Sequence, residues 1–264
     1  MRRRAGESAS SAHRNTTAVR FRDRPYSRDE RRKNASAREA CANPEESGFY
    51  IIYMFTGIIT ETGITERVSR RRIRVRAKRA FMKKMRTGTS ISVDGACLTA
   101  AKKHTGEWFE ADLMPETVAR TNLGALQRGR AVNLELPATP SSFLSGHIVQ
   151  GHVDGVGKVT GARRERGGLV LSLSFPPRLS RYIAEKGSVA INGVSLTVIE
   201  TTRGTCAVGI IPHTATHTNL GALKKGDAVN IETDVIAKYL ERLSYSSVLQ
   251  NTRIRKSLRK NTRV

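Results

Sequence analysis

Two segments near the middle and the end of the chain are copies of each other. Residues 121–135 and 218–232 share eleven of fifteen positions at an offset of 97. The blocks Val93–Thr99 and Ile191–Thr197 recur at an offset of 98, and Leu113–Thr117 and Ile210–Thr214 at 97. Three blocks in the same order at nearly constant spacing indicate a duplicated domain of just under a hundred residues. This period is too long for a solenoid, so each copy should fold around its own core.

Length and cysteine content agree with two ordinary domains. About a hundred residues per copy can bury a core without disulfides or a structural metal. The three cysteines, Cys41, Cys97 and Cys206, are odd in number and lack metal-ligand spacing. This pattern favours a reducing compartment, and we expect a cytoplasmic protein.

The formal net charge of +23 is concentrated at the ends. Residues 1–53 carry 12 basic and 7 acidic residues (+5), residues 244–264 carry 6 and none (+6), and the 190 residues between them carry the remaining +12. We therefore interpret 1–53 as a disordered basic extension and 249–264 as a basic tail. No nucleic-acid-binding motif accompanies the charge, and we expect no nucleic-acid partner.

The first 53 residues are unlike a targeting segment. Seven acidic residues argue against a transit peptide, so organelle targeting by residues 1–53 is the less favoured alternative to translation starting at Met54. The apolar run 49–55 has no basic segment directly before it and no cleavage site after it, and we interpret it as part of a first strand. No run approaches the roughly 20 apolar residues of a membrane span, so no membrane partner is expected.

The patterning between the ends predicts an all-β fold. Residues 73–77, 132–136 and 169–175 alternate apolar and polar side chains, as half-buried strands do. Asp94-Gly95 and Asn192-Gly193 stand at equivalent places between apolar runs and predict hairpin turns. Many short strands favour a small antiparallel barrel over a sandwich, because closure removes exposed edges.

Few helices are expected. Residues 178–186 and, more weakly, 80–86 precede a glycine and suggest short helices. A clearer helix starts at Thr233 or Asp234 and carries Val235, Ile236, Tyr239, Leu240 and Leu243 on one stripe. This stripe needs a surface to cover it, either the barrels or another copy of the helix.

Chemistry from the residues alone points to two similar sites. No dinucleotide or phosphate loop and no nucleophile elbow is present, and His147 and His152 lack metal-ligand spacing. Cys97 and Thr99 in copy one, and Ser195 and Thr197 in copy two, lie two residues apart and so on one face of a strand. With the main chain at Leu98 and Leu196, they suit a flat heterocycle with amide-like edges. The alternative is that Cys97 is a small buried apolar residue and the threonines are ordinary strand residues.

Several motifs together resemble the riboflavin synthase family. They are Met54–Ile59, Gly95–Thr99, Leu113–Thr117, Thr121–Gly124, Ser145–His147 with Gly151-His152, Lys186-Gly187, Asn192–Thr197, Ile211–Thr214 and Val229–Asp234. Each is weak alone, but their order over residues 54 to about 243 is specific. The 53-residue extension departs from the family pattern, in which Phe-Thr-Gly-Ile stands at the start of the chain.

The resemblance implies two tandem six-stranded antiparallel Greek-key barrels with a C-terminal α-helix. The implied boundaries are 54–150 and 151–233 for the barrels and 234–248 for a helix that joins three chains. The implied reaction is the dismutation of two 6,7-dimethyl-8-ribityllumazine molecules into riboflavin and 5-amino-6-(D-ribitylamino)uracil, with no cofactor and no metal. Active sites would form between the first barrel of one chain and the second barrel of its neighbour.

The resemblance also assigns residues to these sites. Candidate catalytic residues are His152, Ser195, Cys97, Asp234 and Phe55, with His152 or a Ser195–Asp234 pair for proton transfer and Cys97 or water as nucleophile. Phe55 and Gly57 to Ile59 are expected to close over the first-barrel site. The implied substrate-binding residues are Gly57, Ile58, Ile59, Ser90, Cys97, Leu98, Thr99, Asp112, Leu113, Met114, Pro115, Glu116, Thr117, Gly151, His152, Val153, Lys186, Ser195, Leu196, Thr197, Ile211, Pro212, His213, Thr214, Ala215 and Thr216.

Two alternatives stay open. A non-catalytic lumazine- or flavin-binding protein would be expected to let one repeat's site decay, whereas Cys97-Leu98-Thr99, Ser195-Leu196-Thr197 and Lys186 are all present here. A basic β-barrel that binds RNA is less favoured, and a strong salt-dependent affinity for RNA would support it.

Overall fold

The computed structural model describes residues 54–244. The expected extension 1–53, the basic tail 249–264 and the last residues of the expected helix 234–248 lie outside the described residues.

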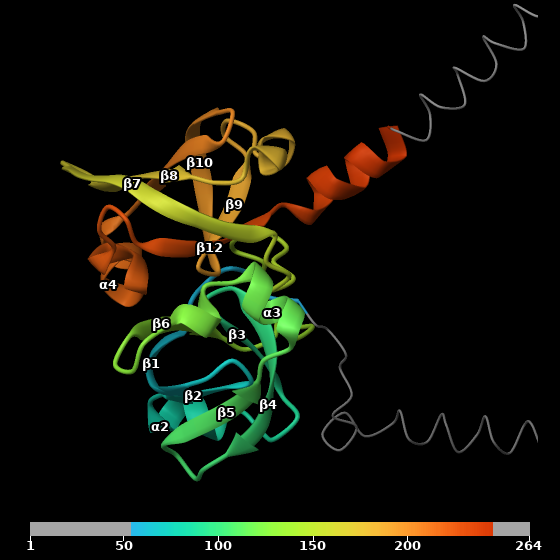
Figure 1. Cartoon of the computed structure of the whole chain (residues 1–264), viewed down its shortest axis with the longest axis vertical. Helices are drawn as coiled ribbons and strands as arrows, with labels where there is room; N and C mark the ends of the chain where they lie inside the picture. The colour runs from blue at the N-terminus through green and yellow to red at the C-terminus, as the bar shows by residue number, and fades with distance from the viewer. Residues whose placement is uncertain (1–53, 245–264) are drawn as a thin grey trace, which may run out of the picture. The chain divides into compact units, whose positions relative to one another are not determined.

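The first repeat forms a closed barrel of six antiparallel strands (Figure 1). The barrel order is β1-β2-β5-β4-β3-β6, and three short helical segments lie between strands. The strands are β1 (Glu61–Val68), β2 (Arg72–Arg76), β3 (Ser90–Val93), β4 (Ala96–Lys103), β5 (Trp108–Asp112) and β6 (Ala131–Glu135); the helices are α2 (Arg79–Lys83), α3 (Pro115–Arg120) and η1 (Leu123–Ala125).

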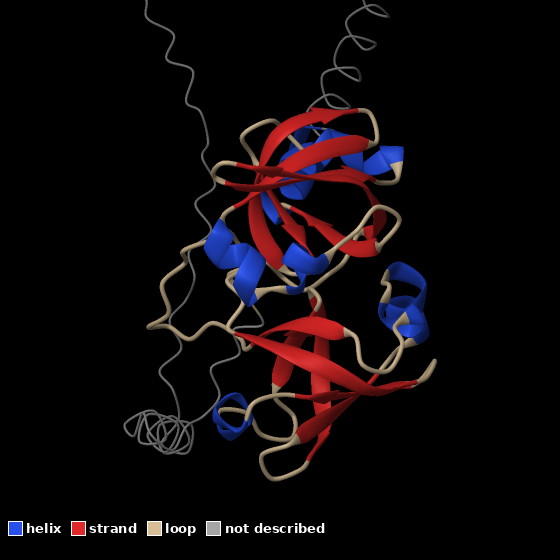
Figure 2. Ribbon diagram, turned by 90° about the vertical axis from the view of Figure 1, so that its left-hand side faces the viewer, coloured by secondary structure: helices blue, strands red, loops and turns tan. Residues whose placement is uncertain are grey.

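The second repeat has the same topology. Read from its first strand, the circular order β7-β8-β11-β10-β9-β12 matches that of the first barrel strand for strand. The strands are β7 (Gly155–Glu165), β8 (Gly168–Ser174), β9 (Ser188–Ile191), β10 (Val194–Thr202), β11 (Thr205–Ile210) and β12 (Ala228–Thr233); the helices are η2 (Pro177–Tyr182), α4 (Pro212–His217) and η3 (Asn219–Ala222). The prediction of two six-stranded antiparallel barrels is confirmed (Figure 2).

Each barrel has a core of its own, filled by alternate residues of its strands. In β8, Leu169, Leu171 and Leu173 point inward and are buried, while the residues between them are partly exposed. Each such leucine contributes roughly 1.5–3 kcal/mol when it leaves water. Since the period of burial is two, the residues that flank a buried one reach the barrel surface.

The two predicted hairpin turns are confirmed. Asp94 and Gly95 have φ of 45° and 79°, and Asn192 and Gly193 have the same two values. The first turn joins β3 to β4 and the second joins β9 to β10. Both central positions take positive φ, which Asx-Gly tolerates better than other pairs.

Some local predictions were wrong. Residues 49–53 of the expected first strand lie outside the described residues; from residue 54 onward the first strand begins at Glu61, and Phe55 forms an isolated bridge with Val149. The expected helix 178–186 is a 3₁₀ segment that ends at Tyr182, and the expected helix 80–86 is the single turn α2. Helices α3 and α4 were not predicted, although each has proline in its first turn, a common start signal.

The C-terminal helix is present from residue 235 to residue 244, where the described part ends. The Asp234 carboxylate accepts a 2.9 Å hydrogen bond from the Ile236 N–H, which caps the helix. Val235 is buried, whereas Ile236, Tyr239, Leu240 and Leu243 are all more than half exposed. Across residues 54–244, no helix is long and apolar enough to span a bilayer.

Candidate active site

The two barrels meet through contacts that occur twice, once in each direction. The Asn122 N–H donates to Asn230 Oδ1 at 2.8 Å, and the equivalent Asn219 N–H donates to Asn133 Oδ1 at 2.8 Å. Gly95 approaches the other hairpin so closely that a Cβ added there would lie 2.6 Å from the Gly193 nitrogen. The repeated asparagine and glycine blocks therefore hold the two barrels together.

The same reciprocity governs the segments that lead into each barrel. We call residues 55–59 the first arm and residues 149–153 the second arm. The arms pair with each other, because the Phe55 N–H donates to Val149 O at 2.7 Å and the Val149 N–H donates to Phe55 O at 3.0 Å. The Cys97 N–H then donates to Gly151 O, and the Ser195 N–H donates to Gly57 O, both at 2.8 Å. Each arm thus lies on the strand edge of the other barrel.

This arrangement changes one expectation. Phe55 and residues 57–59 were expected to close over the first barrel, but within one chain Gly57 lies against Ser195 of the second. The second arm, which carries His152, covers Cys97 of the first barrel. Gly57 and Gly151 have positive φ, 75° and 78°. A Cβ added to Gly57 would lie 2.6 Å from the Ser195 Cβ, and one added to Gly151 would lie 2.6 Å from the Cys97 Cβ.

The first-barrel site centres on Cys97. Its side chain lies on the outer face of β4 beside Thr99, and Ser90 on the neighbouring strand hydrogen-bonds to the sulfur. Burial raises the pKa of the Cys97 thiol, and the bond from Ser90 offsets only part of this effect. The thiol therefore remains protonated near neutral pH.

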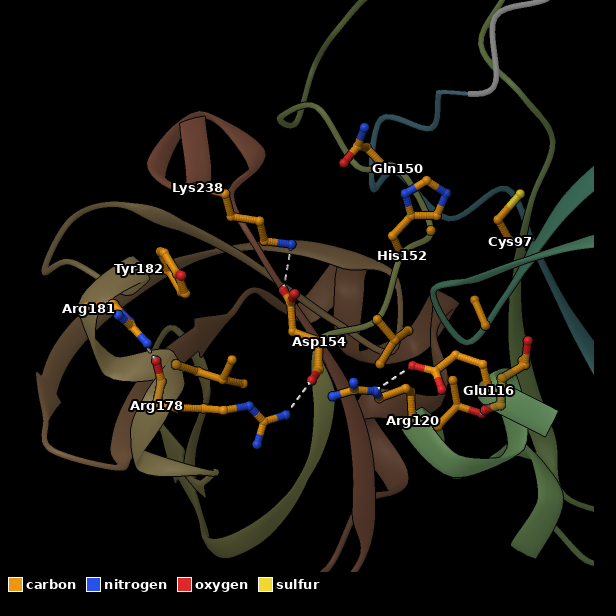
Figure 3. Close-up of a pocket in the computed structure, with 16 residues that line it drawn as sticks. Cys97, Glu116, Arg120, Gln150, His152, Asp154, Arg178, Arg181, Tyr182 and Lys238 are labelled. Atoms are coloured by element: carbon orange, nitrogen blue, oxygen red, sulfur yellow. Dashed lines mark hydrogen bonds and ion pairs between the residues drawn. The ribbon is translucent and has the colours of Figure 1, made fainter. Parts of the chain in front are cut away.

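A cavity of about 660 Å³ opens beside Cys97. It brings together Cys97, Glu116, Thr117, Gly151, His152 and Val153, all of which the sequence had assigned to the site. Figure 3 shows His152 between Gln150 and Cys97 at one end of this cavity.

The opposite wall of the cavity is basic, and sequence reasoning missed it. Lys238 pairs with the Asp154 carboxylate at 2.7 Å, and Arg178 donates to the Asp154 carbonyl oxygen at 2.8 Å (Figure 3). Arg120 pairs with Glu116 at 2.8 Å at the edge of the cavity. The basic side chains come from three separate elements, η2, α3 and the C-terminal helix, so no local motif signals that they converge.

The second-barrel site centres on Ser195. Its Oγ lies 2.7 Å from His147 Nδ1, a residue that the sequence had not assigned to the site. The expected partner, Asp234, instead accepts the Ile236 N–H, and its charge raises the pKa of His147. Burial outweighs this effect and lowers the pKa, so the imidazole is neutral near pH 7. His147 Nε2 is buried without a hydrogen-bond partner among the described residues.

Five further predicted residues fall into two groups. Leu98, Leu113 and Leu196 have their side chains in the barrel cores, so they can reach a ligand only through their main chain. Met114 and Ile211 are exposed at equivalent places, just before α3 and α4.

The two copies differ chemically around these short helices. Glu116 pairs with Arg120, whereas His213, its counterpart in copy two, stacks on His217 at 4.1 Å. Lys186 lies in a turn beside β10, where its N–H donates to Val198 O at 2.9 Å. Within residues 54–244, no group of three or more His, Cys, Asp or Glu side chains is placed to hold a metal.

Comparison with known proteins agrees with the duplicated architecture. The lumazine binding domain family matches residues 56–137 and again residues 150–234. Two solved structures of LumP, complexed with 6,7-dimethyl-8-(1'-D-ribityl) lumazine and with riboflavin, each align with a TM-score of 0.61 and 27% identity over 68% of this chain and 99% of theirs.

Riboflavin synthases from three bacteria are similar over most of their length. The protein from Mycobacterium tuberculosis is 41% identical over 201 residues, which are 74% of this chain and 100% of that protein. Those from Actinobacillus pleuropneumoniae (39%, covering 71% and 88%) and Bacillus subtilis (36%, covering 74% and 91%) are comparably close. With both repeats matched and these relatives covered almost completely, the chain belongs to the riboflavin synthase family of enzymes.

Proposed function

We propose that this chain converts two molecules of 6,7-dimethyl-8-ribityllumazine into riboflavin and 5-amino-6-(D-ribitylamino)uracil. One molecule donates four carbon atoms to the other, with no other reactant and no net oxidation. The observation that carries the proposal is the pair of equivalent strand edges at Cys97 and Ser195, each covered by the other repeat's glycine. Two identical substrates with opposite roles need two similar but unequal sites, and the two copies differ at these residues and at Glu116 and His213.

Orientation should supply most of the rate. The C7 methyl group of the substrate is acidic because its anion delocalises into the ring, so a modest base suffices. Holding the two rings against each other converts a bimolecular step into a unimolecular one, for which effective molarities can reach about 10⁵ M or more. The outward-facing hydroxyls of Thr99 and Thr197 and the main chain beside them would fix the heterocycle edges.

Ser195 and His147 are the proposed proton-transfer pair. A neutral imidazole whose Nδ1 accepts the Ser195 hydroxyl proton leaves the Ser195 oxygen able to take a proton from the substrate and pass its own to His147. His152, above Cys97, is the alternative. The raised pKa of Cys97 favours water over its thiol as the nucleophile.

Assembly would complete the sites. The exposed stripe on the C-terminal helix suits a homotrimer in which the first barrel of one chain faces the second barrel of its neighbour. The family's substrate, 6,7-dimethyl-8-ribityllumazine, is the proposed ligand of both barrels.

A binding protein without catalysis is the second candidate, because LumP shares this fold and has been solved with lumazine and with riboflavin. The test incubates the purified full-length chain with 6,7-dimethyl-8-ribityllumazine alone and follows riboflavin absorbance. One riboflavin per two lumazines consumed supports the proposal. Stoichiometric binding without product would support the second candidate instead.

A further inference from the structure

Two buried carboxylates form part of the junction between the barrels. Glu135 on β6 and Glu232 on β12 occupy equivalent places in the two repeats and are almost fully buried. Burial raises the pKa of both carboxyls, that of Glu232 to about 7. Keeping an acidic group in such a place costs free energy, which needs a structural reason.

The reason lies in the arms. Glu135 Oε1 accepts the Thr56 N–H at 2.7 Å and Oε2 accepts the Gly57 N–H at 3.0 Å. Glu232 Oε1 accepts the Gln150 N–H at 2.7 Å and Oε2 accepts the Gly151 N–H at 2.9 Å. Each carboxylate thus holds two consecutive N–H groups of the arm that leads into its own barrel.

Beyond that anchor, each arm contacts the opposite barrel. Gly57 accepts the Ser195 N–H, and Ile59 packs against the core of the second barrel. Gly151 accepts the Cys97 N–H, and Val153 packs against the core of the first. Both the hydrogen bonds and the apolar contacts thus join each arm to the barrel that it does not lead into.

We propose that Glu135 and Glu232 are positioning residues that act crosswise, each fixing the arm that borders the ligand site of the other barrel. Glu232 belongs to the second barrel but sets where Gly151 and His152 lie over Cys97. Glu135 belongs to the first barrel but sets where Gly57 lies over Ser195. That these places bind a ligand rests on the proposed function, whereas the contact of each arm with the opposite barrel rests on the hydrogen bonds and packing alone.

Glutamine in place of either glutamate tests the proposal in the full-length chain. The amide keeps one acceptor oxygen but turns its NH₂ group toward an N–H, so one bond to the arm is lost. The readout is hydrogen exchange at single amides, which needs no substrate. Glu232→Gln is expected to speed exchange of the Cys97 N–H by about tenfold and that of Ser195 by less than about twofold, since one charge-assisted bond is lost locally. Glu135→Gln should give the reverse.

Ladder amides of β5 and β11 are the control, because a general loss of stability would speed them as well. Faster exchange at Cys97 and Ser195 alike in either variant, or faster exchange only in the barrel that carries the substitution, would overturn the proposal.

Thr56→Val is a milder variant, should glutamine prevent folding. It removes the 2.7 Å bond from the Thr56 hydroxyl to Glu135 Oε1 and the 3.2 Å bond that this hydroxyl accepts from the Ile58 N–H, and it leaves both backbone donors to Glu135 in place. We expect a smaller rise, about threefold, at Ser195 alone, because the carboxylate and its bonds to the Thr56 and Gly57 N–H groups remain. An unchanged Ser195 N–H would contradict the proposal. If each glutamine variant speeds amide exchange in the opposite barrel but the unsubstituted chain does not turn over lumazine, the proposed function is refuted and the positioning role stands.

Discussion

Ser195 Oγ and His147 Nδ1 lie 2.7 Å apart, although 48 residues separate them in the chain. The hydroxyl comes from the second barrel and the imidazole from the segment that joins the two barrels. This contact gives the candidate second site a polar pair whose two members can be tested as one unit.

Removing either member of this pair should remove most of the activity. Ser195→Ala and His147→Ala are each expected to lower kcat about 10²-fold, the lower range for a positioned acid or base. The double variant should lose little more, because residues that act as one unit give non-additive losses. His147→Asn keeps a polar group near the Nδ1 position and should recover part of the rate. Multiplicative losses in single-turnover assays would show that the two residues act independently.

Cys97→Ser should retain turnover within about fivefold of the unsubstituted chain. Burial raises the pKa of the Cys97 thiol, so little thiolate is present near neutral pH and the sulfur is a poor nucleophile. The hydroxyl preserves the contact with Ser90 and copies the residue found at the equivalent place in repeat two. Steady-state kinetics between pH 6 and 9 is the measurement, and a loss of more than about 10²-fold would restore Cys97 as the nucleophile.

Asp94→Asn should stabilise the protein at pH 8. Asp94 is fully buried, and burial raises its pKa from 3.8 to about 7. Between these values the folded state binds a proton that the unfolded state does not. The free energy of unfolding therefore falls as pH rises through this window, by at most about 1.4 kcal/mol per pH unit, and levels off above it. Urea titrations from pH 4 to 8 should show this slope reduced in the variant. Glu232, with a pKa of about 7, and Glu135, whose pKa burial also raises, contribute to the part that remains.

Asn192, which occupies the place of Asp94 in the second repeat, supplies the matched control. Asn192 donates from its amide to Asn219 Oδ1 at 3.3 Å, whereas the corresponding Asn122 Oδ1 is buried without a partner among the described residues. Asparagine at position 94 can provide that missing donor. Asn192→Asp should do the opposite and destabilise the chain at pH 8 by about 2 kcal/mol, as expected for an uncompensated buried carboxylate. Equal effects of the two substitutions would contradict this explanation.

Gly151→Ala should lower the free energy of unfolding by more than the strain of placing alanine at positive φ. Alanine at positive φ costs roughly 1–2 kcal/mol, and here the added Cβ would also lie 2.6 Å from the Cys97 Cβ. Gly129→Ala isolates the first effect, because φ is 86° there and no atom lies within 4 Å of the added Cβ. Thermal unfolding and kcat should both separate the two variants. Indistinguishable behaviour would mean that the second arm has room to move.

Charged substitutions on the C-terminal helix should break assembly. Ile236→Asp and Leu240→Asp place carboxylates on the exposed apolar stripe and are expected to reduce the proposed trimer to single chains in sedimentation velocity. Ile199→Asp, on the partly exposed surface of β10, is the control and should leave the mass unchanged. An unaltered mass in all three variants would exclude this helix as the interface.

The sequence predicted the barrels well because their signals are local or repeated. Alternating apolar residues mark β8, and Asx-Gly marks both hairpins. The helix after the second barrel was equally readable from its stripe and its cap at Asp234. In each case the residues that determine the structure lie within a few positions of one another.

The site was less predictable, because its partners converge from distant segments. His147 was considered as a metal ligand with His152 and as part of the motif Ser145–His147, and nothing near it in sequence indicates Ser195. Glu135 and Glu232 stand in the repeated blocks, but a repeat does not show that their carboxylates hold the arms. Arg178 and Lys238 reach the first cavity from different elements of the second barrel and its helix.

The reciprocal contacts at Asn122, Asn133, Asn219 and Asn230 make the interface between the two barrels isologous, because one repeat presents a surface that fits a copy of itself. The chain is in effect a tethered homodimer. In an untethered homodimer every substitution appears on both sides of the symmetry axis, so the two sites stay identical. Joining the copies in one polypeptide removes that constraint, and each side can change alone. Aspartate at 94 against asparagine at 192, and cysteine at 97 against serine at 195, are differences that only a fused pair can hold.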